Sequence, residues 1–233
     1  MSTSPVRTQW VELAPGFGGL LALPPAGRGP GLVLFQEIFG VNAHIGAVAE
    51  QYALDGFVVL APDLFWRARP RVQLGYEGAE RQQAIALMQG YAAGEALADI
   101  TDAVAALRAR PEVTADKVGA LGYCMGGRLA YLAAATTDVD AAVAYYGGGI
   151  HGQLDRAAAV RCPMQFHYAG RDEHIPPAAV QQVREAMAGK TVEVHVYAQA
   201  QHGFNCWARA AYDAPSAALA HGRTLAFLAA ALF

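Results

Sequence analysis

Cys124 is the residue of this sequence that is best placed to do chemistry, because of the residues around it. It lies in Gly122-Tyr123-Cys124-Met125-Gly126, between an apolar run and a helix-like stretch. A strand, a sharp turn and a helix around the pattern G-x-nucleophile-x-G form a nucleophile elbow, usually built on serine. The turn is strained and too crowded for flanking side chains, so the flanking residues are glycine. The pattern predicts a nucleophilic cysteine whose thiolate is stabilised by the helix N-terminus.

A cysteine nucleophile needs a base, and the base needs an acid that orients it. Elbow folds place these groups along the chain in the order nucleophile, acid, histidine. Two segments after Cys124 fit this order: Gly170-Arg171-Asp172 follows one predicted strand, and Gln201-His202-Gly203 follows the next. We therefore predict that Cys124, Asp172 and His202 form a triad at one edge of the sheet.

Other residues are weaker candidates for these roles. Glu173 and His174 adjoin Asp172 and could substitute for it, but Asp172 directly follows the Gly-Arg turn. Asp63 also ends a strand, but it precedes the nucleophile, so we expect it to form a turn or cap. Cys162 lacks a glycine frame and is expected to be structural, since most lone cysteines pack in the core. The remaining histidines are expected at the surface or as caps: His44, His151, His167, His174, His195 and His221.

The composition fits one soluble domain spanning residues 1–233, since α/β folds of this length are often single units. Net charge is −3 and no Lys or Arg run could neutralise a phosphate backbone, so nucleic-acid binding is not expected. Three cysteines do not suggest a disulfide framework and suit a reducing cytosol. Residues 1–23 do not resemble a signal peptide, and no segment reaches the ~18 residues of a spanning helix. We expect a cytoplasmic monomer with no membrane partner.

Strands alternate with helices along most of the chain. Strands are predicted at Val6–Leu13, Gly18–Ala22, Leu32–Gln36, Phe57–Ala61, Lys117–Tyr123, Ala141–Tyr146, Pro163–Ala169 and Val192–Ala198. Helices are predicted at Ala43–Leu54, Glu77–Met88, Gly94–Arg110, Met125–Ala135, Ala178–Ala188 and Ala217–Leu232. The first two strands are read as an antiparallel pair. The alternation that follows predicts an α/β protein with a mostly parallel sheet covered on both faces, whose carboxyl strand ends carry the function.

The chain resembles the dienelactone hydrolases (carboxymethylenebutenolidases), cysteine enzymes with the α/β-hydrolase fold. Nearly the whole chain takes part, and the segment Gln36-Glu37-Ile38-Phe39-Gly40-Val41-Asn42 is specific to that family. The other matching segments are Ala61-Pro62-Asp63-Leu64, Glu80-Arg81-Gln82, Gly122-Tyr123-Cys124, Tyr145-Tyr146-Gly147, Asp172, His202 and Arg223-Thr224-Leu225. The resemblance implies a mostly parallel central sheet flanked by helices on both faces.

The resemblance also implies a reaction: hydrolysis of an enol-lactone that carries a free carboxylate, such as 4-carboxymethylenebut-2-en-4-olide to maleylacetate. It implies that Glu37 helps to deprotonate Cys124 once the small-molecule substrate arrives, which protects the resting thiol from oxidation. It further implies that backbone N–H groups of Ile38 and Met125 hold the oxyanion. No metal or organic cofactor is needed, and the sequence contains no ligand cluster of metal spacing.

The implied substrate pocket departs from the family pattern. Its residues are Phe39, Arg81, Ile85, Met88, Tyr145, Gly203, Cys206 and Arg209. Of the two arginines that bind the substrate carboxylate in the family, Arg81 matches one, whereas Cys206 stands at the position of the other. Arg209 follows Cys206 closely and could reach back. Ile85 and Met88 stand where the family has pocket aromatics, and Gly203 replaces a serine. Cys206 is expected to be an apolar filler, the alternative being a reversible disulfide with Cys124.

This altered pocket leaves two other functions open. The protein could be a broader carboxylesterase or thioesterase, which would favour neutral aryl esters over butenolide carboxylates. It could also be a scaffold that binds a ligand or senses oxidants without turnover, because fold alone does not imply function.

Overall fold

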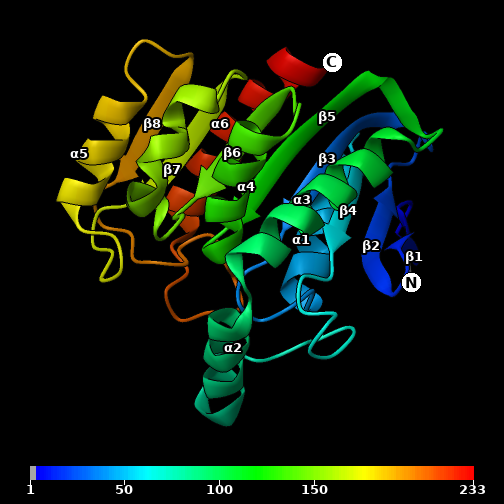
Figure 1. Ribbon diagram of the computed structural model, residues 1–233, viewed down its shortest axis with the longest axis horizontal. Helices are drawn as coiled ribbons and strands as arrows, with labels where there is room; N and C mark the ends of the chain where they lie inside the picture. Colours follow the sequence, from blue (N-terminus) through cyan, green and yellow to red (C-terminus); the bar gives the residue numbers. More distant parts are fainter. Residues whose placement is uncertain (1–3) are drawn as a thin grey trace. The chain divides into compact units, whose positions relative to one another are not determined.

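The computed structural model describes residues 4–233, and the chain divides into two compact units, residues 1–119 and 120–233. The boundary falls within strand β5 (Val113–Tyr123). The strands form an eight-stranded, mostly parallel sheet in the order β1-β2-β4-β3-β5-β6-β7-β8 (Figure 1). The predicted α/β class is therefore confirmed, whereas the single-domain organisation stays a prediction. No helix of residues 4–233 combines the length and apolar character needed to cross a membrane.

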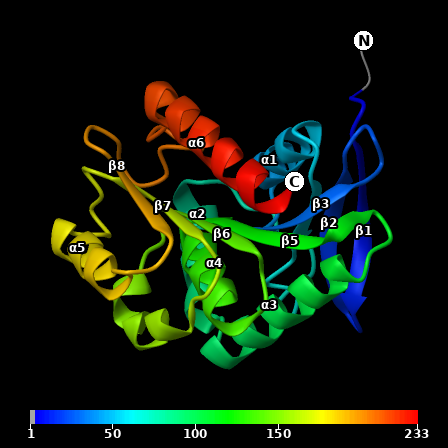
Figure 2. The same ribbon diagram turned by 90° about the horizontal axis from the view of Figure 1, so that it is seen from above.

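The first unit is built around four strands that precede β5. Its elements are β1 (Arg7–Ala14), β2 (Phe17–Leu23), β3 (Gly29–Phe35), α1 (Ala43–Leu54), β4 (Val58–Pro62), α2 (Gly78–Gly90) and α3 (Ala93–Arg108). β1 and β2 are antiparallel, as predicted; β2 also pairs antiparallel with β4, and β4 lies parallel to β3. α1 and α3 cover opposite faces of these strands (Figure 2), whereas α2 buries only Ala84.

The second unit continues with parallel strands. Its elements are α4 (Met125–Thr136), β6 (Ala141–Tyr145), the 3₁₀ segment η1 (Ile150–Ala159), β7 (Met164–Ala169), α5 (Pro177–Ala186), β8 (Val192–Tyr197) and α6 (Ala214–Leu232). β6, β7 and β8 pair in parallel, with α4 and α6 on opposite faces. The sequence reading missed η1, because glycine and a non-helical Gln153 interrupt it and leave no helical periodicity.

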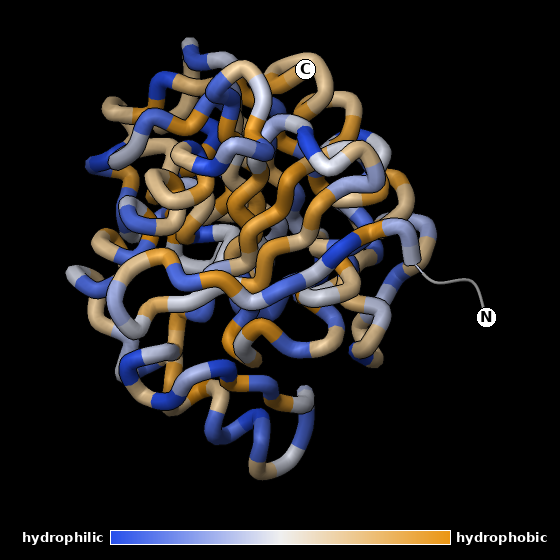
Figure 3. The backbone as a smooth tube through the Cα atoms, turned by 90° about the vertical axis from the view of Figure 1, so that its right-hand side faces the viewer, coloured by the Kyte–Doolittle hydropathy of each residue, from blue (hydrophilic) through white to orange (hydrophobic). Residues whose placement is uncertain are grey.

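Local sequence explains why these elements form. β3 and β4 are buried at every residue, which is why they read as continuous apolar runs. α1 begins where the Asn42 side chain accepts a hydrogen bond from the backbone N–H of Ile45. Long hydrophobic stretches of chain run through the interior, whereas hydrophilic residues are frequent in the outer turns (Figure 3). The packed strands thus supply the rigid support from which the functional loops extend.

The prediction that the histidines other than His202 lie at the surface or at caps was wrong for His44 and His167, which are both buried. The His167 ring is hydrogen-bonded through Nδ1 to the Tyr197 hydroxyl and through Nε2 to Thr224, at 2.8 and 3.0 Å. Burial lowers the pKa of His167 well below its ordinary value, so the ring is neutral. The hydroxyl of Tyr145 is bonded to Thr224 at 2.7 Å and belongs to the same core network.

Candidate active site

Cys124 occupies a strained turn between β5 and α4. Its φ is +57° and its ψ −117°, a conformation that L-residues rarely adopt. The turn is also crowded, because a Cβ at Gly122 would lie 2.0 Å from the carbonyl oxygen of Gly126, and one at Gly127 would lie 2.6 Å from that of Tyr145. The backbone N–H of Cys124 donates to the Tyr145 carbonyl at 3.0 Å. The geometry expected of a nucleophile elbow is present at this cysteine.

His202 is hydrogen-bonded to both other members of the predicted triad. Its Nδ1 lies 2.8 Å from Oδ2 of Asp172, and its ring also shares a hydrogen bond with the Cys124 side chain. Burial by itself would lower the pKa of His202, but the bonds with Asp172 and Cys124 and the charges of both groups raise it to about 10. The imidazole is therefore strongly stabilised in its protonated form.

Asp172 is held in place on its other side by backbone groups. Its side chain is fully buried, and Oδ1 accepts hydrogen bonds from the N–H groups of His174 and Ile175 at 2.8 and 3.2 Å. This turn forms directly after β7. A carboxylate that receives backbone bonds on one oxygen and the imidazole on the other is fixed in orientation. Asp172, rather than Glu173 or His174, thus supplies the carboxylate partner of His202.

The loops that follow β7 and β8 are tied to each other. The N–H of Gly170 donates to Tyr197, and the N–H of Arg171 donates to Ala200, at 2.8 and 2.9 Å. Gly170 permits this approach, because a Cβ there would lie 2.6 Å from the Ala198 oxygen. The loops that carry Asp172 and His202 therefore keep one relative placement.

Two further rings contact His202, and the sequence reading did not assign either one to the site. The Tyr146 ring lies edge-on at a centroid distance of 5.1 Å, and the His174 ring lies perpendicular at 5.0 Å. Tyr146 directly follows a strand in the segment Tyr145-Tyr146-Gly147, a position that could have indicated its role. His174 was considered as a substitute for Asp172 and was otherwise expected at the surface or at a cap, and it is exposed.

The loop after His202 brings Arg209 back onto Gly203. Gly203 has φ +85°, and a Cβ there would lie 2.4 Å from Nη1 of Arg209. Arg209 is half-buried, and its backbone N–H donates to the carbonyl of Cys206 at 3.0 Å. Cys206 is fully buried, and Cys124, Cys162 and Cys206 form no disulfide with one another. The described structure therefore contains no disulfide between Cys124 and Cys206.

Most of the remaining predicted site residues belong to the first unit. Glu37 and Phe39 are buried in the segment after β3, where Ile38 lies between them, and the Phe39 ring makes an edge contact with Tyr76 at 4.6 Å. The helix α2 carries three more: Arg81 is exposed, and Ile85 and Met88 are half-buried. In the second unit, Met125 is the first residue of α4. Their roles toward a substrate stay predictions.

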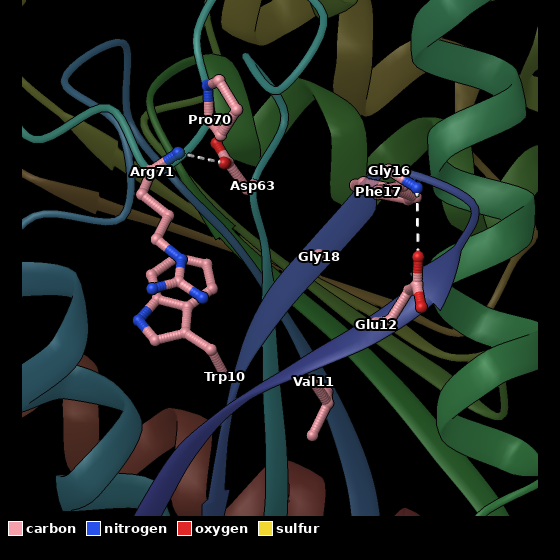
Figure 4. A pocket seen from close by; sticks show the side chains of 9 residues that line it. All are labelled: Trp10, Val11, Glu12, Gly16, Phe17, Gly18, Asp63, Pro70 and Arg71. Carbon is pink, nitrogen blue, oxygen red and sulfur yellow. Dashed lines mark hydrogen bonds between the residues drawn. The ribbon is translucent and has the colours of Figure 1, made fainter.

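Asp63 has the structural role that the sequence predicted. Its carboxylate accepts a hydrogen bond from the backbone N–H of Arg71, and the two residues line a cavity of ≈ 260 Å³ in the first unit (Figure 4). Arg71 has φ +55°, and its guanidinium lies 4.9 Å from the Trp10 ring centroid. Burial raises the pKa of Asp63. The carboxyl group closes the loop after β4, and the cavity is lined by no residue of the predicted triad.

Comparisons with known proteins agree with this geometry. The model of the dienelactone hydrolase family matches residues 17–232. The carboxymethylenebutenolidase of Pseudomonas putida is 37% identical over 215 residues, which cover 91% of each chain. That of Pseudomonas sp. (strain P51) is 35% identical over 214 residues, covering 91% of this chain and 89% of the relative. The crystal structure of a putative dienelactone hydrolase from Klebsiella pneumoniae superposes with a TM-score of 0.84 at 28% identity, covering 96% of this chain and 98% of that one. The chain therefore belongs to the dienelactone hydrolase family, and it is a hydrolase of carboxylic ester or lactone bonds.

Proposed function

We propose that this protein hydrolyses a dienelactone-type enol-lactone, 4-carboxymethylenebut-2-en-4-olide to maleylacetate or a related lactone, through Cys124, His202 and Asp172. The observation that carries the proposal is the hydrogen-bonded array itself. One imidazole is bonded both to a cysteine on a strained elbow and to a buried carboxylate. The names of the relatives support the lactone as the substrate class.

In the proposed reaction, the thiolate of Cys124 attacks the lactone carbonyl, and the bond from that carbon to the ring oxygen breaks. A thioester forms, and the departing enolate takes a proton from the imidazolium of His202. The neutral imidazole then accepts a proton from the water that attacks the thioester. The C–S bond breaks and the carboxylic acid leaves. The Cys124 thiolate then takes back the proton that Glu37 accepted when substrate arrived, which restores the resting thiol beside the His202 imidazolium. Asp172 stays ionised throughout and holds the imidazole in the productive orientation.

Glu37 and the oxyanion donors complete the proposal. The buried carboxylate of Glu37 is proposed to take the Cys124 proton when substrate arrives, so that the thiol is protected at rest. The N–H groups of Ile38 and Met125 are proposed to bind the oxyanion, a contribution of ~3 kcal/mol per donor in comparable sites. Glu37→Gln should lower substrate-stimulated thiolate formation but spare binding. Unchanged turnover of this variant would refute the role.

Substrate recognition is proposed to use two cations. Arg81 on the exposed helix α2 is one of them. Arg209 is the other, because its guanidinium lies over Gly203, the residue next to His202, while Cys206 is buried. The rest of the pocket is proposed to be lined by Phe39, Ile85, Met88 and Tyr145. Because the hydroxyl of Tyr145 is hydrogen-bonded to Thr224, Tyr145 is proposed to contribute its aromatic ring rather than its hydroxyl.

The direct test compares Cys124→Ala with Cys162→Ala, a matched change at a free cysteine outside the array. Hydrolysis of a butenolide carboxylate should disappear in the first variant and persist in the second. Intact mass after rapid quenching should reveal an acyl adduct on the wild type and on Cys162→Ala, and no adduct on Cys124→Ala. Retained hydrolysis in Cys124→Ala would overturn the mechanism. Faster turnover of neutral aryl esters, with no effect of Arg81→Ala, would indicate the broader esterase instead.

A further inference from the structure

The helix α2 carries three residues of the proposed pocket but has little packed support of its own. Of its 13 residues, only Ala84 is buried, and in Figure 1 the helix extends away from the strands of the first unit. Arg81, Ile85 and Met88 share one face of α2 at helical spacing. The opposite face borders a cavity of ≈ 400 Å³ beside the segment after β4, and the α2 residues that line this cavity are Gln83, Ala86, Leu87 and Gly90. The orientation of Arg81 is therefore set mainly by how the two ends of α2 are held.

A tyrosine hydroxyl holds the chain at each end of α2. Before the helix, the hydroxyl of Tyr76 accepts a hydrogen bond from Nδ2 of Asn42 at 3.1 Å. Directly after the helix, the hydroxyl of Tyr91 donates to Oδ2 of Asp99 at 2.9 Å. The backbone N–H of Tyr91 also donates to the carbonyl of Met88 at 3.3 Å. A displacement of Tyr91 therefore displaces the last turn of α2.

Asp99 is a rigid anchor for Tyr91. Its side chain is fully buried, and it belongs to α3, which packs against strands of the first unit. Nη1 of Arg67 donates to both carboxylate oxygens at 2.9 Å, and Nε1 of Trp66 donates to Oδ1 at 3.4 Å. A buried carboxylate is tolerated only with such partners. Asp99 thus joins α3, the segment after β4 and the end of α2.

We propose that Asp99 is a positioning residue for substrate binding: through the hydroxyl of Tyr91, it holds α2 in the orientation that presents Arg81 to the carboxylate of the lactone. The inference rests on the proposed function, because that function assigns the carboxylate contact to Arg81. No covalent bond changes and no proton moves. Loss of the anchor lets α2 sample other orientations, which weakens the contact of Arg81 with the substrate and leaves the chemistry of the triad intact. The expected signature is a higher KM for anionic substrates with an unchanged kcat.

The kinetic test uses two variants of the anchor. Tyr91→Phe keeps the ring that contacts Phe65 edge-on and removes only the hydroxyl, whereas Asp99→Asn keeps the size of the side chain and weakens all its bonds. The KM for a butenolide carboxylate should rise about tenfold in each, since a bond to a charged group is worth about tenfold or more in affinity. The KM for a neutral aryl ester and both kcat values should not change. Tyr131→Phe is the matched control, because it removes a hydroxyl bonded to the Gln153 carbonyl at 3.0 Å in the second unit.

A double variant shows whether Tyr91 acts through Arg81. If it does, Tyr91→Phe should add no further loss in the Arg81→Met background, because the contact that it positions is already gone. Losses that multiply would overturn the inference. So would equal rises in KM for the anionic and the neutral substrate, since a merely structural role would affect both alike.

Hydrogen exchange of the backbone amides of residues 78–90 measures the anchor without any substrate. These amides should exchange about tenfold faster in Tyr91→Phe than in the wild type and in Tyr131→Phe, because one hydrogen bond no longer holds the end of the helix. Unchanged exchange would overturn the inference even if the wild type hydrolyses the lactone. A wild type that hydrolyses no lactone would overturn the proposed function, while faster exchange in Tyr91→Phe would still support the anchoring of α2 by Asp99.

Discussion

The guanidinium of Arg209 occupies the space that a side chain at position 203 would need. A Cβ at Gly203 would lie 2.4 Å from Nη1 and 2.8 Å from Cζ of Arg209. Because Gly203 directly follows His202, the missing side chain lets a cation approach the loop that carries the proposed base. The conformation of Arg209 therefore requires a glycine at position 203.

This contact predicts that Gly203→Ala destabilises the protein in two separable ways. The φ of +85° costs an L-residue about 1–2 kcal/mol, and the new Cβ must also displace Arg209. Arg209→Ala in the Gly203→Ala background should remove the second cost and keep the first. Urea unfolding of both single variants and the double variant measures this as a coupling free energy. Purely additive effects would contradict the contact.

Arg209→Met should impair hydrolysis of anionic substrates selectively. Loss of a hydrogen bond to a charged group costs about 1.5–3 kcal/mol, or about 10- to 150-fold in kcat/KM. Turnover of a neutral aryl ester should change little, because no carboxylate is bound. Arg171→Met, at an exposed arginine in the turn before Asp172, is the comparison. Equal losses on anionic and neutral substrates would argue against carboxylate binding by Arg209.

Asp172→Asn should lower kcat by about 10³–10⁴-fold while leaving the fold intact, as expected when the orienting acid of a triad is replaced by an amide. The bonds from His174 and Ile175 to Oδ1 can remain, but the other side chain atom can no longer stabilise an imidazolium. The pKa of His202 should fall, because the bond with Asp172 is one of its main raising causes. Glu173→Gln changes an exposed neighbouring residue and should leave kcat nearly at the wild-type value. The pH profile of kcat and a thermal unfolding curve would test both statements.

The buried His167 should make the protein less stable in acid. Its pKa in the folded state lies well below the ordinary value near 6.5, so below about pH 6.5 the unfolded chain binds a proton that the folded chain does not. Stability attributable to this group is complete above pH 6.5 and falls by about 1.4 kcal/mol for each unit below it until the folded pKa is reached.

Urea unfolding at pH 5 and pH 8 would measure this dependence. His167→Asn should be less stable than the wild type at pH 8, because Tyr197, Thr224 and Gln165 each lose one of their hydrogen bonds. The difference between the two proteins should shrink at pH 5, because only the wild type loses the stability linked to His167. An unchanged difference would mean that His167 does not contribute to the acid sensitivity.

Gly122→Ala should be among the most damaging changes in the chain. A Cβ there would lie 2.0 Å from a backbone oxygen of the elbow, which cannot move without opening the turn. A loss of more than ~3 kcal/mol of stability, with loss of Cys124 reactivity, is expected. Gly148→Ala is the control, since nothing lies within 4 Å of its would-be Cβ. Comparable stability of both variants would show that the turn is not crowded.

Much of this arrangement could be predicted before the structure. Continuous apolar runs identified the buried strands, and the bounds of α1 agree with its periodicity. The flanking glycines indicated Cys124 as the nucleophile. The order nucleophile, acid, histidine along the chain indicated Asp172 and His202 as its partners.

Most strand bounds moved by a residue or more, and two strands begin much earlier than predicted. β3 begins at Gly29 rather than Leu32, and β5 begins at Val113 rather than Lys117. The early part of β5 contains positive φ angles at Ala115 and Asp116, which the residue types do not indicate. The 3₁₀ segment η1 left no periodic signal.

The amino-acid sequence by itself determined the fold class, the family and the identity of the groups that could exchange a proton, because residue type, spacing and order are local properties of the chain. Only the tertiary structure decided that His174 packs against His202, that Arg209 covers Gly203, and that His167 is a neutral core residue. These contacts form only when loops and strands pack against one another. No single segment of the sequence determines that packing, so the burial of a side chain and the contacts of its ring could not be read from the local sequence.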